Sequence, residues 1–395
     1  MKKHLPSGWQ EVKLQECLLE QPKYGMNAPA VKYDNLLPTY IRITDIDEYG
    51  NFIDGNKVSV NNDNYKEYIL HKNDFLFART GASVGKTYLY NEKDGLLVFA
   101  GYLIKVVPNQ NKLNSLFLKY YTQSKRYWDF VKTTSARTGQ PGINGKEYAN
   151  MDIILPPLDE QNRIADILST FDDLIENLTK LIEKKELYKK GVMQRVLSGE
   201  VRFNGFTDEW KTVKLKDILI VGSKDRVPDT SKYKKITIKL HNKGIEFSNI
   251  ERKMADKRPF YIRKKDEIII GKQNYFNGSI AIVDEEFDNT ICSNAIMSFT
   301  VNEDCNNKFI YFLLSRKSYM QKYYHLANGT GQKELSESDF LNFNLLIPSL
   351  EEQNKIAELL TLIDKDIEIL KQILQLRKLQ KKGVMQKLLT GEVRV

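Results

Sequence analysis

The chain has 395 residues, of which 41% are hydrophobic and 11% aromatic, a composition typical of packed globular domains and not of disordered protein. It has no apolar run of about 18 residues and no apolar core after the start MKKHLPSGWQ, so we expect neither a transmembrane helix nor a secretory signal, and we expect a cytoplasmic protein. Three cysteines without a CxxC pair and four widely separated histidines argue against a disulfide framework and a metal site.

The charge is more informative, because 60 Lys and Arg against 51 Asp and Glu leave a net charge of +9. Residues 230–265 alone hold twelve basic and three acidic side chains, mixed with aromatic residues. Such a segment suits the neutralisation of nucleic-acid phosphates, with Lys232 and Lys239 as candidate contacts. An ordinary solvated basic face remains the alternative.

The first 155 residues are predicted to form short strands and turns. Gly81-Ala-Ser-Val-Gly85-Lys86-Thr87 is similar to a phosphate-binding loop, but only three residues separate its glycines and β-prone sequence follows it. We therefore expect a turn between strands that exposes Arg79, Thr80 and Lys86, and we add Arg42 as a further candidate DNA contact. The sequence shows no other catalytic motif. An enzyme acting on a nucleotide would therefore rest on this imperfect loop alone, and we rank it below the DNA-binding hypotheses that follow.

A helix-like stretch at 115–131 precedes the loop TTSARTGQPGING, and a second one at 308–324 precedes HLANGTGQKELSE. Arginine can read guanine and glutamine can read adenine through paired hydrogen bonds in the major groove. The loops therefore offer four candidate DNA contacts, Arg137, Gln140, Gln332 and Lys333. We call the parts of the chain before the two tails, residues 1–155 and 204–347, the first and second body. The turn GKQNYFNGS of the second body offers three more candidates, Lys272, Gln273 and Asn274, but this turn lacks the Arg-Thr-Gly of the first body. Ordinary structured loops are the alternative.

The chain is a tandem repeat of a unit of about 200 residues. KKGVMQRVLSGEVRF at 189–203 returns 192 positions later as KKGVMQKLLTGEVRV, with eleven of fifteen residues identical, and LPPLDEQNRIADIL at 155–168 returns as LIPSLEEQNKIAELL from 346. The ends of the two copies are nearly the same, whereas their bodies share little. Shared ends indicate a shared partner or role, and different bodies indicate two different ligands of one kind.

Both tails carry a heptad seam without an interior proline, and each predicts a helix about 55–60 Å long. The seam residues are Ile164, Leu168, Phe171, Ile175, Leu178 and Ile182 in the first copy, and Ile356, Leu360, Ile363, Ile367, Leu370 and Leu374 in the second. We expect the two helices to pair antiparallel and hold the bodies apart; the alternative is that each helix buries only its own domain's core. The recurring tetrapeptide is a candidate docking surface, formed by Gly191, Val192, Met193 and Gln194, and by Gly383, Val384, Met385 and Gln386.

On these helix motifs and the order body–helix–body–helix, the chain resembles the specificity subunit of type I restriction–modification enzymes over its whole length. The resemblance implies an α+β fold with an internal pseudo-two-fold repeat: target recognition domains at 1–155 and 204–347, and repeated helical regions at 156–203 and 348–395 that pair as an antiparallel coiled coil. It further implies an asymmetric bipartite DNA site, two docked modification subunits, and restriction subunits that join them.

S-adenosylmethionine, ATP and Mg²⁺ would then act on those partner subunits, and the resemblance implies no cofactor and no catalysis in this chain. The alternative from another class is a coiled-coil scaffold that binds nucleic acid without sequence specificity.

Overall fold

A computed structural model describes residues 5–136, 139–248, 258–326 and 334–395 of the chain. The chain divides into two compact units, and neither corresponds to one copy of the sequence repeat. The first unit combines Met1–Thr179 with the tail Gln372–Val395, and the second unit is Lys180–Lys371. Each unit therefore contains one body, the first part of the helix that follows it, and the tail of the other copy.

The first unit is built on a four-stranded antiparallel sheet in the order β2-β9-β6-β7. Its central strand β6 has four completely buried residues, so a continuous apolar run, not an alternating one, forms this strand. A second sheet, β3-β5-β4-β8, contains one parallel pair, β4 with β8. The strands of the unit are β1 (Gln10–Lys13), β2 (Lys23–Tyr24), β3 (Val31–Lys32), β4 (Thr39–Ile41), β5 (Val58–Ser59), β6 (Phe75–Ala78), β7 (Thr87–Leu89), β8 (Leu97–Phe99), β9 (Leu103–Val106) and β10 (Asp152–Leu155).

The second unit repeats this framework with a sheet in the order β12-β19-β16-β17, and β11 pairs with β20 as β1 pairs with β10. The outer strands differ, because here two separate pairs, β13-β14 and β15-β18, take the place of the four-stranded second sheet. The strands are β11 (Lys211–Lys214), β12 (Leu219–Val221), β13 (Ile236–Ile238), β14 (Ile245–Phe247), β15 (Phe260–Arg263), β16 (Ile268–Gly271), β17 (Ile280–Ile282), β18 (Thr290–Ser293), β19 (Ile296–Val301) and β20 (Asn344–Ile347). The shared framework and the unlike outer strands match the uneven divergence of the two bodies in sequence.

Both units also contain short helices. The prediction of one continuous helix before each tail is wrong. Each stretch is two helices, because Ser124 caps the second helix of the first unit by accepting a hydrogen bond from the Tyr127 amide, and Arg316 lies in extended conformation before the second helix of the other unit. The helices are α1 (Ser115–Tyr121), α2 (Lys125–Thr134) and α3 (Gly145–Ala149), then α5 (Leu215–Ile218), α6 (Asn307–Leu314), α7 (Lys317–Tyr323) and α8 (Glu337–Leu341).

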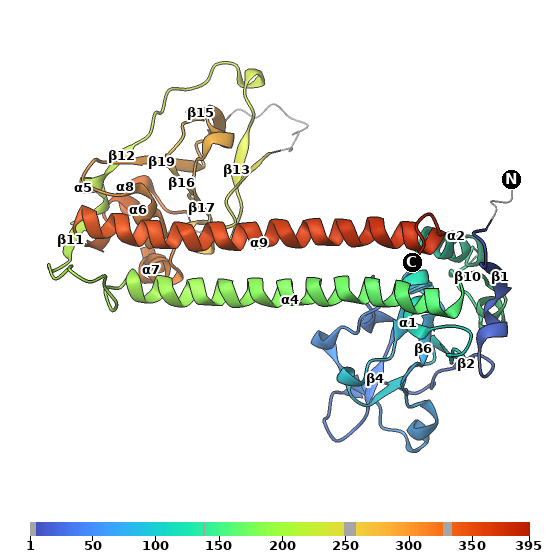
Figure 1. The fold of residues 1–395 in the computed structure, drawn as a ribbon. Helices are drawn as coiled ribbons and strands as arrows, with labels where there is room; N and C mark the ends of the chain where they lie inside the picture. The colour runs from blue at the N-terminus through green and yellow to red at the C-terminus, as the bar shows by residue number, and fades with distance from the viewer. Residues whose placement is uncertain (1–4, 137–138, 249–257, 327–333) are drawn as a thin grey trace. The chain divides into compact units, whose positions relative to one another are not determined.

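The two tails form the long helices α4 (Leu158–Val196) and α9 (Leu350–Thr390), drawn green and red in Figure 1. All twelve seam residues are buried or half-buried. In the first unit, Ile164 and Leu168 of α4 share an apolar core with Leu388 and Leu389 of α9. In the second unit, Val196 and Leu197 share the other core with Ile356 and Leu360.

In both units, residues of increasing number along α4 pack against residues of decreasing number along α9, so the expected antiparallel pairing is confirmed.

None of the helices in the described ranges is both long and apolar enough to cross a membrane. In those ranges no three His, Cys, Asp or Glu side chains are grouped as metal ligands.

Candidate nucleic-acid interface and helix junctions

The turn after β6 and the loop that carries Gln140 meet in the first unit, although they are far apart in sequence. The Gly81 amide donates to the carbonyl of Pro141 at 3.0 Å, and the Ile143 amide donates to the carbonyl of Arg79 at 2.9 Å. Thr80 forms an isolated β-bridge with Gly142. A strand, β7, and not a helix follows the turn, which is the strand-to-strand geometry expected from the sequence and not that of a phosphate-binding loop.

Two of the basic candidates of the first unit are engaged in contacts within the protein. The guanidinium of Arg42 holds the buried Asp45 carboxylate through Nε at 2.9 Å and Nη2 at 2.8 Å, and this hydrogen bonding raises the pKa of Arg42 above its ordinary value. Lys86 Nζ donates to the carbonyl of Ile46 at 3.0 Å. Both side chains therefore fix the fold of the loop around residues 42–46.

Arg79 and Gln140 are placed differently. The guanidinium carbon of Arg79 lies 4.8 Å from the ring centroid of Tyr24, and Gln140 is exposed beside Gly81. Gly81 has a φ of +69°, and a Cβ atom there would lie 3.1 Å from Gln140 Nε2, so glycine suits this position. Arg137, the other candidate of this loop, lies outside the described residues.

The second unit has the same junction of turn and loop but other side chains. The Leu335 amide donates to the carbonyl of Lys272 at 2.9 Å, as Ile143 does to Arg79 in the first unit. Lys272 is half-buried, whereas Gln273 and Asn274 are exposed on the turn after β16. The candidates Gln332 and Lys333 lie outside the described residues.

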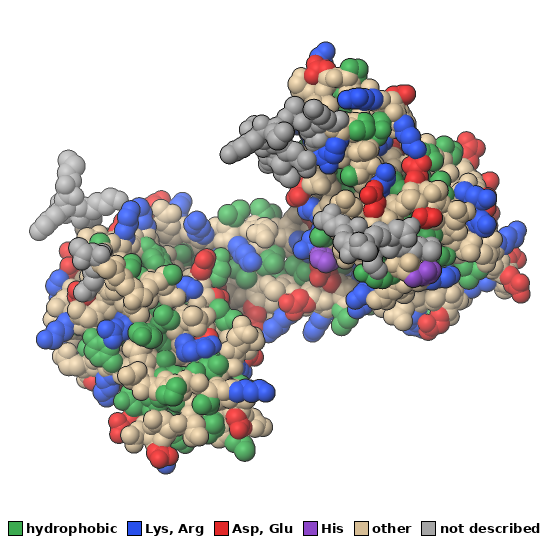
Figure 2. Space-filling model, turned by 180° about the vertical axis from the view of Figure 1, so that it is seen from behind, with side chains coloured by type: hydrophobic (Ala, Val, Ile, Leu, Met, Phe, Trp, Pro, Cys, Tyr) green, Lys and Arg blue, Asp and Glu red, His purple; other side chains and the backbone are tan. Residues whose placement is uncertain are grey.

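The described part of the basic segment 230–265 combines cations with aromatic rings. Lys234 Nζ lies 4.9 Å from the ring centroid of Phe247, and Lys235 Nζ lies 4.8 Å from that of Phe260. Lys232 is exposed and lies 3.8 Å from the Asp229 carboxylate, and Lys239 is half-buried. On the face shown in Figure 2, Lys and Arg side chains are interspersed with Asp and Glu and do not form one continuous basic surface.

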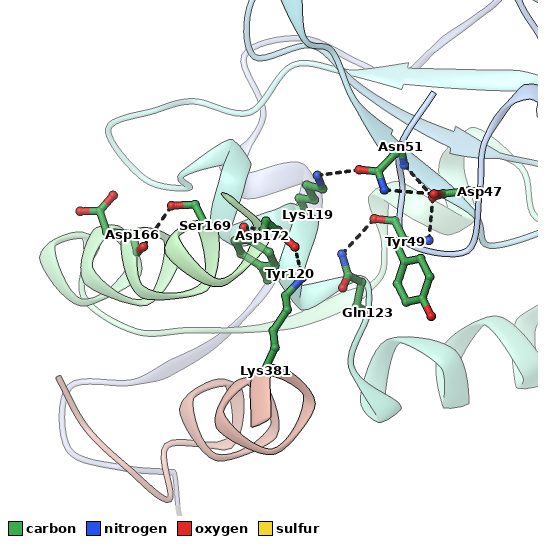
Figure 3. A network of polar contacts seen from close by, with 10 residues as sticks. All are labelled: Asp47, Tyr49, Asn51, Lys119, Tyr120, Gln123, Asp166, Ser169, Asp172 and Lys381. Carbon is green, nitrogen blue, oxygen red and sulfur yellow. Dashed lines mark hydrogen bonds and ion pairs between the residues drawn. The ribbon is translucent and has the colours of Figure 1, made fainter. Parts of the chain in front are cut away.

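The first lysine of each recurring KKGVMQ segment pairs with an aspartate on the opposite helix. In the first unit, Lys381 Nζ lies 2.5 Å from Asp172 Oδ1 and 5.2 Å from the ring centroid of Tyr120, whose hydroxyl donates to Asp172 Oδ2 at 2.8 Å (Figure 3). In the second unit, Lys189 pairs with Asp364. Phe312 lies under Lys189 at 5.7 Å, but it has no hydroxyl to donate.

The arginine of each recurring GEVR segment forms a second ion pair, which sequence reasoning missed. Arg394 holds Glu160 at 2.6 and 2.8 Å, and Arg202 holds Glu352 at 2.9 and 2.6 Å. Both glutamates are buried, and Trp9 Nε1 donates a further hydrogen bond to Glu160 at 3.0 Å. Burial acts to raise the pKa of Glu160, but the hydrogen bonds from Arg394 and Trp9 prevail and lower the pKa below its ordinary value.

The Gln and Asn of each Glu-Gln-Asn motif attach the long helix to its own body. In the first unit, Gln161 Oε1 accepts from the Asn114 amide at 3.0 Å, and Asn162 Oδ1 accepts from Asn114 Nδ2 at 2.8 Å. In the second unit, Gln353 accepts from the Asn306 amide at 2.9 Å, and Asn354 accepts from Asn306 Nδ2 at 2.8 Å. The signal available in the sequence was the recurrence of both Glu-Gln-Asn and Gly-Glu-Val-Arg at one offset.

The eight candidate docking residues fall into two groups. Four are half-buried and pack against the core of the unit that contains them: Val192, Met193, Val384 and Met385. The other four are exposed: Gly191, Gln194, Gly383 and Gln386. A Cβ atom at either glycine would meet no atom within 4 Å, so these positions present open helix surface.

Comparison with known proteins agrees with this repeated construction. The sequence model of the type I restriction modification DNA specificity domain matches twice, at residues 6–186 and 207–377. A type I restriction enzyme MjaVIII specificity subunit from Methanocaldococcus jannaschii is 28% identical over 420 residues, which cover 99% of this chain and 94% of that protein.

Two solved structures share the fold. The S subunit of a type I restriction-modification system from M. genitalium has a TM-score of 0.61 at 18% identity, covering 98% of both chains. The HsdS subunit from Thermoanaerobacter tengcongensis has a TM-score of 0.50 at 17% identity, covering 99% of both chains. Because the family's sequence model covers most of the chain in two copies, the chain belongs to the type I restriction–modification DNA specificity family, as its helix motifs predicted.

Proposed function

We propose that the chain selects the DNA sequence for a type I restriction–modification complex by reading an asymmetric, bipartite site. In this proposal, residues 1–155 and 204–347 are the target recognition domains, and each reads one half-site. The observation that carries it is that one framework presents different side chains at the same place, Arg79 in the first unit and Lys272 in the second. Since the polar groups differ at equivalent turns, the two half-sites should differ in sequence.

The repeated helical regions, 156–203 and 348–395, are the proposed docking sites for two modification subunits. Large apolar side chains recur at heptad spacing on the exposed side of each helix, which is the surface that a partner helix would cover. They are Leu174, Leu181 and Tyr188 on α4, and Leu362, Ile369 and Leu376 on α9. The recurring tetrapeptide adds an exposed glutamine and an open glycine position to each helix.

We assign no chemical step to this chain. Methyl transfer from S-adenosylmethionine belongs to the modification subunits, and ATP-dependent, Mg²⁺-dependent cleavage belongs to restriction subunits that join them in the cytoplasm. The support is the name of the related proteins, which are specificity subunits of restriction enzymes.

The test is a methylation map. The chain is co-expressed with its modification subunit in a methylation-free host, and the native DNA is sequenced. A methylated split motif that requires this chain is the expected result. Its absence, with the modification subunit still co-purifying, would overturn sequence reading and leave only a scaffold.

A domain exchange tests the division of labour. Replacing residues 205–345 with the corresponding domain of another specificity subunit should change only one half of the methylated motif. A change in both halves would contradict the assignment of one half-site to each domain. Binding to the cognate site and to random DNA at one salt concentration then separates sequence reading from general nucleic-acid affinity.

A further inference from the structure

Arg79 is held on an aromatic platform in the first unit. Its guanidinium carbon lies 4.8 Å from the ring centroid of Tyr24, and among the described residues no acidic side chain forms an ion pair with it. By contrast, Arg42 donates hydrogen bonds to the Asp45 carboxylate, and Lys86 donates one to the Ile46 carbonyl. A guanidinium stays charged at neutral pH and carries five N–H donors, so the edge of Arg79 that the ring leaves open can bind an external acceptor.

Tyr24 is itself fixed at both ends. Its backbone pairs with Ile104 of β9, and its hydroxyl accepts a hydrogen bond from the Gly145 amide at 3.0 Å, at the start of α3. Gly145 is buried, and a Cβ atom there would lie 3.5 Å from the Tyr24 hydroxyl. Tyr24 as a whole is nevertheless 44% exposed, so this fixed residue lies at the surface of the unit.

The backbone of Arg79 is equally fixed. Its amide donates to the carbonyl of Tyr102 at 3.0 Å, and its carbonyl accepts from the Ile143 amide at 2.9 Å. The residue follows directly on β6, which is completely buried. With the backbone and the ring both held, little conformational entropy remains for Arg79 to lose when it binds a planar acceptor.

We propose that Arg79 reads a guanine in the half-site bound by residues 1–155, and that Tyr24 is the residue that positions it. This inference rests on the proposed function. The planar fork of a guanidinium matches the O6 and N7 acceptors of guanine in the major groove, whereas an ammonium binds them as a point charge. The second unit has Lys272 at the equivalent turn, so this turn offers the second half-site an ammonium and not a planar fork.

The test uses the full chain in complex with its modification subunit, after the methylation map has given the motif. In Arg79→Lys the charge and the stem remain, but the fork is lost. We expect the preference for one guanine of the first half-site to fall about 10- to 100-fold, with the second half-site unchanged. Unchanged preference at every position of the first half-site, or a first half-site without guanine, would overturn the proposal.

Tyr24 is tested in the same complex. Tyr24→Leu removes the ring and should weaken the preference for that same guanine, whereas Tyr24→Phe keeps the ring and should retain most of it. In the Arg79→Lys background, Tyr24→Leu should have no further effect, because a positioning residue acts only through the side chain it holds. Equal losses in both backgrounds would make Tyr24 merely structural.

If the Tyr24→Leu variant does not assemble with its modification subunit, a modified base tests the proposed contact directly. Each guanine of the first half-site is replaced in turn by 7-deazaguanine, which lacks the N7 acceptor. The unmodified complex should lose affinity at one position, and the Arg79→Ala complex should not respond at that position. A response that persists in Arg79→Ala would assign the N7 contact to another residue. Failure to find any methylated motif would instead refute the proposed function itself.

Discussion

Leu388 lies in the last turn of the last helix, a place where substitutions are ordinarily tolerated. Here it is only 2% exposed, because it packs into the apolar core of the first unit with Trp9 and Leu168. The substitution Leu388→Ala removes three buried carbon atoms, and each buried methylene contributes about 0.8 kcal/mol of hydrophobic free energy. The cavity left behind lowers the stability further. We therefore expect the first unit to lose about 3 kcal/mol of stability.

Amide hydrogen exchange measures this loss unit by unit. A loss of about 3 kcal/mol should speed exchange in β6 roughly 100-fold, since opening is favoured by that factor, while β16 of the second unit stays unchanged. The matched control is Leu379→Ala on the same helix, where the side chain is 66% exposed, and it should change stability by less than about 0.5 kcal/mol. Unchanged exchange in β6, or equal acceleration in both strands, would refute the claim that the second tail completes the first core.

Three further predictions use other measurements. Because the folded-state pKa of Glu160 is depressed, its stabilising effect is present above the ordinary glutamate value of 4.5 and is lost as the pH falls through the lower folded value; Glu160→Gln should flatten this acid dependence of the urea midpoint, and an unchanged slope would contradict it. Burial raises the pKa of the thiols of Cys17, Cys292 and Cys305, so none should react with Ellman's reagent at neutral pH until the protein is unfolded in urea; reaction of the native protein at the rate of a free thiol would be inconsistent with their placement. Lys232→Ala should weaken binding to all DNA sequences alike and reduce the salt slope by about one, and a loss confined to the cognate site would instead make Lys232 a base contact.

The ion pairs at the two helix junctions explain why one segment occurs twice. In each unit the tail of one copy meets the helix start of the other, through Lys381 with Asp172 and Arg394 with Glu160 in the first. A change in either tail must therefore fit a helix from the other copy, which favours two tails of nearly the same sequence. The two bodies are under no such constraint, because each packs its own sheet.

The repeat, the α+β class and the helical seam could all be predicted from the amino-acid sequence. A heptad seam such as Ile164 to Ile182 is visible in the sequence because a helix places residues three and four apart on one face, whatever surrounds it. The family followed from the same motifs. The break between α1 and α2 was missed, since it depends on the cap at Ser124 and not on hydrophobic spacing.

Which charged side chains remain available for a ligand depends on contacts that form only in the folded protein. Arg42, Arg79 and Lys86 were equal candidates in the sequence, yet Arg42 is held by Asp45, Lys86 by a carbonyl, and Arg79 by the ring of Tyr24. The tail of the second copy likewise completes the core of the first unit, where Arg394 meets Glu160. Such pairings join residues that are distant along the chain, so folding in three dimensions, and not local periodicity, selects them.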